Sequence, residues 1–227
     1  MLPGSSPPEF ERLADWLRAK GGFVGSIRLE GEGPERGIVA TAPVHHGELL
    51  LQVPLAACIG EEVARRTRAG AAIYSSWRGP AREPFGLTAA VAELRSSGGS
   101  DWEPYFRTVP ERVEGHPTAL NEAERAACRG TAVGALLGDL SERHQAEWSW
   151  LSGLQDIPFA LSARQWAEVR ALATSRQYFL HPYEGTALVP VADLFNHARL
   201  ADVDWQFNRD EAVFEVRARR DRPAGVA

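Results

Sequence analysis

The sequence predicts an α+β fold in which small β-sheets are interrupted by a mostly helical insertion. Short apolar runs separated by glycine- and proline-containing turns occupy residues 23–53. Apolar residues three or four positions apart dominate residues 61–174, and alternating strand patterns return after Ser175. Strands at both ends of the chain therefore have to form a shared β core, with the helical segment inserted between them.

The length fits a single domain covering residues 1–227. A chain of 227 residues with 44% hydrophobic content can fill one sizeable core. We divide this domain into an N-terminal helix with strands over residues 8–58, a helical insertion over 59–174, and a C-terminal part over 175–227.

The N-terminal part begins with a short amphipathic helix. Its apolar residues recur at helical spacing, Pro8 stands at its start and Gly21-Gly22 closes it after Lys20. The pattern then changes to three strands, which we expect at residues 26–29, 37–40 and 49–53.

The helical middle opens at Glu61-Glu62 and closes its first helix near Gly70, with arginines in the last turn as the helix dipole favours. Further helices are predicted at residues 87–94, 122–137, 142–151 and 163–173. Ser162 and Gln165 form a capping-box pattern before the last of them. Three tryptophans are expected to pack this block together: Trp148, Trp150 and Trp166.

The C-terminal part combines a hairpin with a segment of mixed polarity. Alternation in residues 205–207 and 213–216, around the polar turn 208–211, predicts the hairpin. Upstream, an apolar strand is expected to end abruptly in Asp193 and Asn196-His197. Because Asn and His are costly to bury without a partner, a strand that ends in them is typical of a ligand pocket. The β core requires residues near Gly37 and near Asn196 to meet.

Composition excludes several classes of function. The net charge of −5 and the scattered basic residues argue against nucleic acid as a partner. No stretch is long and apolar enough for a membrane span, and the first residues do not resemble a signal peptide. Cys58 and Cys128 are far apart with no CxxC pair, which argues against zinc and disulfides and favours a reducing, cytoplasmic location. His45-His46 lacks a second ligand pair, so no metal is expected.

The order of the motifs resembles that of SET-domain protein methyltransferases, and in particular the Rubisco large-subunit methyltransferase-like group, whose SET domain is interrupted by a helical insertion. The resemblance extends from Phe10 to Gly225. It depends on the following segments, in this order: Glu35 to Ala40, Gly47 to Leu51 with Val53-Pro54, Trp102-Glu103-Pro104-Tyr105, Ser175-Arg176, and Ala187 to Pro190 through Asp193, Asn196 and His197.

The resemblance implies that S-adenosyl-L-methionine (AdoMet) is the cofactor, held between the loop before the first strands and the Asn-His dipeptide. By this similarity, main-chain groups of Pro34, Glu35 and Arg36 would hold its methionine end, and Arg176 its carboxylate. Asn196 and His197 would hold its amino group and adenine.

The resemblance further implies that Asp193 lines the channel for the target residue and that Tyr178 helps to shape it. No catalytic residue is assigned. The family continues beyond Gly225 with an apolar strand and a Tyr-Gly element, whereas this sequence ends at Ala227. We therefore expect the C-terminal part of the SET domain to be incomplete, without the tyrosine that orients the target amine.

The implied function is AdoMet-dependent N-methylation of a protein lysine, with a protein as substrate. Two alternatives stay open: a catalytically inactive SET-like interaction module, and a protein-histidine methyltransferase. The oligomeric state stays unknown. Taken alone, Asn196-His197 also fits a helix N-cap beside a structural histidine. A hydrolase built on Asp193 and His197 is disfavoured because no nucleophile motif accompanies them.

Overall fold

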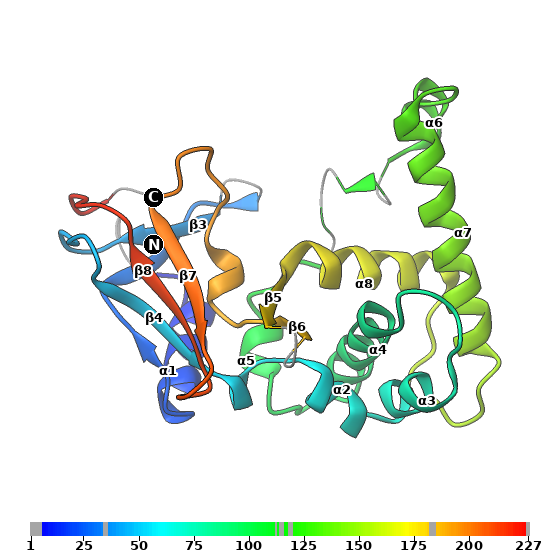
Figure 1. Cartoon of the computed structure of the whole chain (residues 1–227), viewed down its shortest axis with the longest axis horizontal. Helices are drawn as coiled ribbons and strands as arrows, with labels where there is room; N and C mark the ends of the chain where they lie inside the picture. Colours follow the sequence, from blue (N-terminus) through cyan, green and yellow to red (C-terminus); the bar gives the residue numbers. More distant parts are fainter. Residues whose placement is uncertain are drawn as a thin grey trace. The chain divides into compact units, whose positions relative to one another are not determined.

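The computed structural model describes residues 6–33, 36–111, 113, 116–117, 120–181 and 185–225. Small antiparallel sheets and a helical middle region confirm the predicted α+β class (Figure 1). The chain divides into two compact units. We call them the sheet unit, which contains Met1–Gly60, Asp101–Val109 and Gln177–Ala227, and the helical unit, which contains Glu61–Ser100 and Pro110–Arg176.

A four-stranded antiparallel sheet in the order β1-β4-β8-β7 is the main element of the sheet unit (Figure 1). Its strands are β1 (Phe23–Val24), β4 (Leu49–Pro54), β7 (Val203–Asn208) and β8 (Val213–Ala218). Leu51 lies opposite Val216 in the register, and both are buried. The predicted hairpin is confirmed, since β7 and β8 pair directly around the turn.

Two smaller ladders complete the sheet unit. β2 (Ile27–Glu30) pairs with β3 (Gly37–Ala40), and β5 (Gln177–His181) pairs with β6 (Gly185–Leu188). The strands predicted near residues 26–29, 37–40 and 49–53 are therefore confirmed. The remaining elements of the unit are α1 (Pro8–Ala19), which confirms the predicted first helix, together with η2 (Leu55–Ala57), α5 (Glu103–Phe106) and η4 (Ala192–Leu194).

The prediction that an apolar strand runs on to Asp193 was wrong, because β6 already ends at Leu188. Pro190 has no N–H to donate to a ladder. Val191 has φ 69° and ψ −43°, a conformation that a β-branched residue rarely adopts. The chain therefore bends sharply at Val191, and the short helix η4, rather than a strand, carries Asp193.

Six helices form the described part of the helical unit: α2 (Glu61–Arg66), α3 (Arg68–Ser76), α4 (Arg82–Ser96), α6 (Glu122–Ala127), α7 (Ala132–Ser152) and α8 (Ala163–Arg176). Their core is built around Trp166, which is fully buried, with Phe85 and Leu151 beside it. Trp148 and Trp150 pack against this cluster, which confirms the predicted role of the tryptophans. Ser162 and Gln165 exchange the predicted capping hydrogen bonds at the start of α8.

Two predicted helices are each divided by a cap. Thr67 ends the first helix, because its hydroxyl accepts from the Gly70 N–H and so starts α3. Thr131 does the same for α7 by accepting from Gly134, so the helix predicted over residues 122–137 is two helices. The predicted helix over residues 142–151 is the second half of α7.

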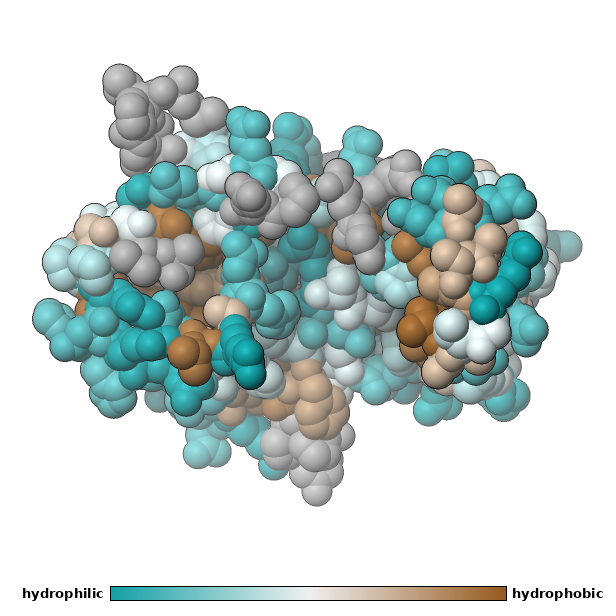
Figure 2. All heavy atoms as spheres, turned by 90° about the horizontal axis from the view of Figure 1, so that it is seen from above, coloured by the Kyte–Doolittle hydropathy of each residue, from teal (hydrophilic) through white to brown (hydrophobic). Residues whose placement is uncertain are grey.

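The first half of α7 carries exposed apolar side chains. Val133 is 56% exposed and Leu136 is 57% exposed. Figure 2 shows hydrophobic atoms at the surface over α6 and α7. The second half of α7 packs one face against α8, where Arg170 donates from Nε and Nη2 to the carboxylate of Glu147 at 3.0 and 3.1 Å. Neither partner of this ion pair is more than 3% exposed.

Candidate functional site

The sheet unit brings Gly37 and Asn196 together, as the sequence predicts. Gly37 is the first residue of β3, and Asn196 follows η4, about 160 positions later in the chain. A Cβ placed on Gly37 would lie 2.2 Å from Asn196 Nδ2 and 2.9 Å from its Cγ. With Asn196 in this position only glycine leaves room, so the Asn196 amide rests directly on the backbone of β3.

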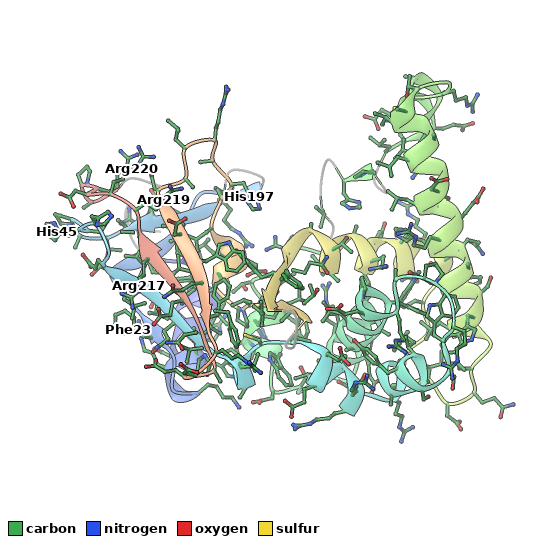
Figure 3. All side chains as sticks on the ribbon, in the orientation of Figure 1. Phe23, His45, His197, Arg217, Arg219 and Arg220 are labelled. Carbon is green, nitrogen blue, oxygen red and sulfur yellow. The ribbon has the colours of Figure 1, made fainter. Side chains whose placement is uncertain are left out.

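Asn196 and His197 are both exposed, and they lie on the loop between η4 and β7. Figure 3 labels His197 on this loop. The next element after them is a strand that starts at Val203, so Asn196 is not a helix N-cap. Because His197 is exposed, it is also not a buried structural histidine. Polar groups of both residues can therefore contact a bound molecule.

Arg36 immediately precedes β3, and its guanidinium donates a hydrogen bond to the main-chain carbonyl of Thr108. This bond uses one of the Arg36 guanidinium donors and links Arg36, the residue before Gly37, to Thr108. The other two loop residues that the resemblance selects, Pro34 and Glu35, lie outside the described residues.

Asp193 lies on η4 and accepts a hydrogen bond from the hydroxyl of Tyr105, with 2.9 Å between Tyr105 Oη and Asp193 Oδ2. Tyr105 is fully buried. The phenol of a buried tyrosine generally requires an acceptor, and a carboxylate is a strong one. The tyrosine therefore restricts the orientation of the Asp193 carboxylate.

Tyr178 on β5 stabilises the start of the same turn, because its hydroxyl donates to the Ala192 carbonyl at 2.8 Å. Its ring makes edge contacts with Trp205 and Phe214, whose centroids lie 5.3 and 4.9 Å away. Tyr178 is thus a packed residue that joins β5 to η4 beside Asp193. Its predicted role in shaping the channel stays a prediction.

Arg176 belongs to the helical unit, where it is the last residue of α8. It directly precedes Gln177, the first residue of β5 in the sheet unit. The structure therefore assembles Arg36, Tyr178, Asp193, Asn196 and His197 within one unit, and places Arg176 at the covalent junction between the units. The cofactor-binding role of Arg176 stays a prediction.

A small recess borders the Asn196 side chain. It has a volume of about 170 Å³, and most of its walls are apolar residues of β2, β3, β4 and the loop that includes Asn196. Asp202 and Arg222 also line it, and they form a two-pronged ion pair at 2.7 and 2.9 Å. Hydrogen bonds from Arg222 lower the pKa of Asp202. The recess suits an uncharged part of a ligand.

A wider concavity of about 620 Å³ lies in the helical unit, between α7, α8, Pro117 and residues 120–125. His144, Arg125 and Arg164 line it, and none of the predicted site residues does. Its volume does not make it the better candidate, since the motifs that indicate cofactor chemistry all lie elsewhere. In the described residues, no three metal-ligating side chains come together.

Sequence reasoning assigned no role to Tyr105, although the Trp102-Glu103-Pro104-Tyr105 motif was part of the resemblance. Residues 101–109 lie between helices of the insertion in sequence, yet they cluster with the sheet unit. Trp102 Nε1 donates to the Ala57 carbonyl at 2.9 Å and anchors the segment there. The sequence feature that could have indicated a role for Tyr105 is the pair of aromatic residues on either side of Glu103-Pro104 at the start of a helix.

No protein-family model matches the chain. Human SET domain-containing protein 4 is 25% identical over 236 residues, an alignment that covers 94% of this chain and 52% of that protein. Rat N-lysine methyltransferase SETD6 is 29% identical over 226 residues, an alignment that covers 86% of this chain and 46% of that protein. The chain spans about half the length of the curated relatives that it matches.

Solved structures show the same fold at lower identity. The SET domain of LSMT bound to methyllysine and AdoHcy superposes with a TM-score of 0.83 at 19% identity, and the match covers 98% of this chain and 52% of the other. Rubisco LSMT bound to AdoMet gives a TM-score of 0.80 at 17% identity, with 97% and 51% coverage. The fold is therefore SET-like. Among the residues that the structure describes, no helix combines the length and apolar character needed to cross a bilayer.

Proposed function

We propose that this chain, which is a SET-domain protein of the group related to Rubisco LSMT, SETD4 and SETD6, binds AdoMet and serves N-methylation of a protein lysine. One observation carries the proposal: the Asn196 amide rests on Gly37, so the start of β3 and the Asn-His dipeptide lie against each other. The resemblance expects the cofactor between this dipeptide and the loop that leads into β3.

The residues present fit such a cofactor. Asn196 and His197 expose an amide and an imidazole, which can hydrogen-bond to amino and adenine groups. The Arg36 guanidinium donates to the Thr108 carbonyl, so we assign the main chain of Arg36, and not its side chain, to the cofactor. Arg176 would supply a charge-assisted bond to the carboxylate. The recess beside Asn196 can take an uncharged portion of the molecule, although its 170 Å³ is too small for all of it.

The chemistry of the reaction requires alignment more than acid-base strength. When bound, AdoMet would supply a methyl group to the neutral amine of a lysine, with its sulfonium sulfur as the leaving group; the methylated nitrogen then carries the positive charge, and its extra proton passes to solvent. The chain's own contribution would be orientation: Asn196 and Arg176 on the cofactor side, and the carboxylate of Asp193 facing the cationic substrate side chain. Neither a metal nor a covalent enzyme intermediate is required for this displacement.

Support for the lysine target comes from relatives. SETD6 is named an N-lysine methyltransferase, and LSMT has been solved with lysine and with methyllysine. Because this chain spans about half the length of those proteins, the substrate and activity are proposed for this chain by similarity alone.

Calorimetric titration of the purified chain with AdoMet tests the cofactor site. We expect saturable binding that weakens by about 1–3 kcal/mol in Asn196→Ala, the usual cost of losing a buried or charge-assisted hydrogen bond. Asn208→Ala is the matched control, because Asn208 ends β7 at the hairpin turn and only its Oδ1 contact with the Glu211 N–H would be lost. Absence of any binding by the wild-type chain would refute the proposal.

Incubation with radiolabelled AdoMet and candidate protein substrates tests the reaction. Hydrolysis of the labelled product should release methylated lysine. Label on histidine would instead support the histidine-directed alternative, and AdoMet binding without any incorporation would support the interaction module.

A further inference from the structure

The segment Asp101–Val109, which we call the bridging segment, links the two sides of the candidate site. It is anchored to the sheet unit by the Trp102 indole, which donates to Ala57, and by an ion pair of 2.6 Å between Lys20 and Asp101. The helix α5 within it packs against α1. The bridging segment thus has its own attachments, independent of the site.

From this anchored position, the bridging segment makes one hydrogen bond to each side of the site. The Tyr105 hydroxyl donates to Asp193 on η4, and the Thr108 carbonyl accepts from Arg36 at the start of β3. Tyr105 and Thr108 are both fully buried. They are tied to each other as well, because the Thr108 N–H and hydroxyl donate to the Tyr105 carbonyl at 2.9 and 2.8 Å.

A buried turn that bonds to both sides can fix their relative geometry. A tyrosine side chain has only two major torsions, so a buried one positions its hydroxyl with little entropic cost on binding. Tyr105 would therefore hold the Asp193 carboxylate in one orientation, and a carboxylate is the group that attracts a lysine ammonium.

We infer that Tyr105 is a positioning residue for the substrate lysine, acting through the carboxylate of Asp193, and that the same turn fixes Arg36 on the cofactor side through the Thr108 carbonyl. This inference rests on the proposed function, since it assigns Asp193 to the lysine side of the site. It distinguishes two effects: loss of the Tyr105 hydroxyl should weaken lysine binding, while the Thr108–Arg36 contact and the cofactor side stay intact.

Binding titrations of the full chain test this inference without requiring turnover. The probes are AdoHcy alone, followed by free L-lysine at saturating AdoHcy, monitored by NMR. We expect Tyr105→Phe to weaken lysine binding about ten-fold, the effect of one lost charge-assisted hydrogen bond, and to change AdoHcy affinity less than two-fold. Tyr74→Phe is the matched control, because Tyr74 is buried in the helical unit and its hydroxyl lies at a marginal 3.5 Å from the Glu83 carbonyl.

Asp193→Asn and the double variant Tyr105→Phe/Asp193→Asn complete the experiment. In the Asp193→Asn background, Tyr105→Phe should weaken lysine binding no further, and the two melting-temperature shifts should not add. Equal loss of lysine and AdoHcy affinity in Tyr105→Phe would reduce Tyr105 to a structural role and overturn the inference, as would additive effects of the two substitutions.

Outcomes with the wild-type chain separate the two hypotheses. A chain that does not bind AdoHcy refutes the proposed function, and with it the positioning role, even if the melting shifts show the Tyr105–Asp193 bond. A chain that binds both AdoHcy and lysine, but whose Tyr105→Phe variant binds lysine as tightly as the wild type, keeps the proposed function and overturns the inference alone.

Discussion

Asn196 occupies the space in which any residue other than glycine at position 37 would carry its Cβ, 2.2 Å from the Asn196 Nδ2 atom. The contact joins the start of β3 to the loop after η4. Because Asn196 is an exposed side chain, it can move away from an added methyl group, but it then leaves its place on the strand.

Gly37→Ala should therefore reduce AdoMet affinity much more than stability. We expect affinity to fall by at least the 1–3 kcal/mol that we assign to the Asn196 contact, while the melting temperature changes little. Calorimetry and thermal unfolding on the same preparation measure both quantities.

Gly138→Ala serves as the control for that substitution. Gly138 lies inside α7, where an added Cβ would meet nothing within 4 Å, so alanine should stabilise the helix by up to about 1 kcal/mol and leave AdoMet affinity unchanged. A Gly37→Ala variant that binds AdoMet as the wild type does would show that the position of Asn196 is irrelevant to the cofactor.

Glu147→Gln should destabilise the helical unit strongly. The Glu147 carboxylate is fully buried and accepts two hydrogen bonds from Arg170, so its neutralisation leaves a buried guanidinium without a counter-charge. Breaking such a pair costs about 3–5 kcal/mol in the free energy of unfolding. Urea denaturation followed by tryptophan fluorescence measures it, because Trp148 and Trp166 lie in this unit.

Glu62→Gln is the exposed counterpart, since Glu62 pairs with Arg66 on the surface of α2 with about three quarters of each side chain exposed. This variant should stay within about 0.5 kcal/mol of the wild type. Similar losses in both variants would contradict the assignment of the Glu147 effect to burial.

Acidification should weaken the fold partly through His144. Burial, followed by the charge of Arg170, lowers the pKa of His144 to about 4 from an ordinary value of 6.5. Below pH 6.5 the unfolded chain binds a proton at this residue that the folded chain does not bind until about pH 4. The free energy of unfolding therefore falls as the pH drops through this interval, by at most about 3 kcal/mol from this group.

His144→Gln removes this titrating group. Between pH 6.5 and 4, the free energy of unfolding of the variant should therefore fall less with pH than that of the wild type. Denaturation at a series of pH values measures the difference between the two proteins, which cancels the carboxylates that titrate in both. Parallel curves for the wild type and the variant would show that His144 binds protons equally in the folded and unfolded states.

The two cysteines should differ in reactivity. Cys58 is 1% exposed, and burial raises its pKa to about 12, so the folded protein holds almost no thiolate at this position. Cys128 is only partly buried. At pH 8, Ellman's reagent should label Cys128 quickly and Cys58 only as the protein unfolds. In Cys128→Ser the fast phase should disappear, and its persistence would mean that Cys58 is accessible.

Local patterns predicted the elements that depend on near neighbours. The helix after Pro8, the strands near Gly37 and Leu49, and the β7–β8 hairpin follow from periodicity and turn residues. Errors arose where one residue overrides a pattern. Thr67 and Thr131 cap new helices within apolar runs, and the positive φ of Val191 ends a strand that its apolar neighbours would continue.

For the candidate site, the sequence by itself determined the fold class, the family resemblance and the requirement that Gly37 meet Asn196, because motif order and strand patterning are properties of the chain. Only the tertiary structure decided that the Asn196 amide fills the missing Cβ of Gly37 and that Tyr105 hydrogen-bonds to Asp193. These contacts join residues about 160 and 88 positions apart. Such separations leave no local periodicity, and a single hydroxyl or a missing methyl group finds its partner only when the packing of the sheet unit brings the segments together.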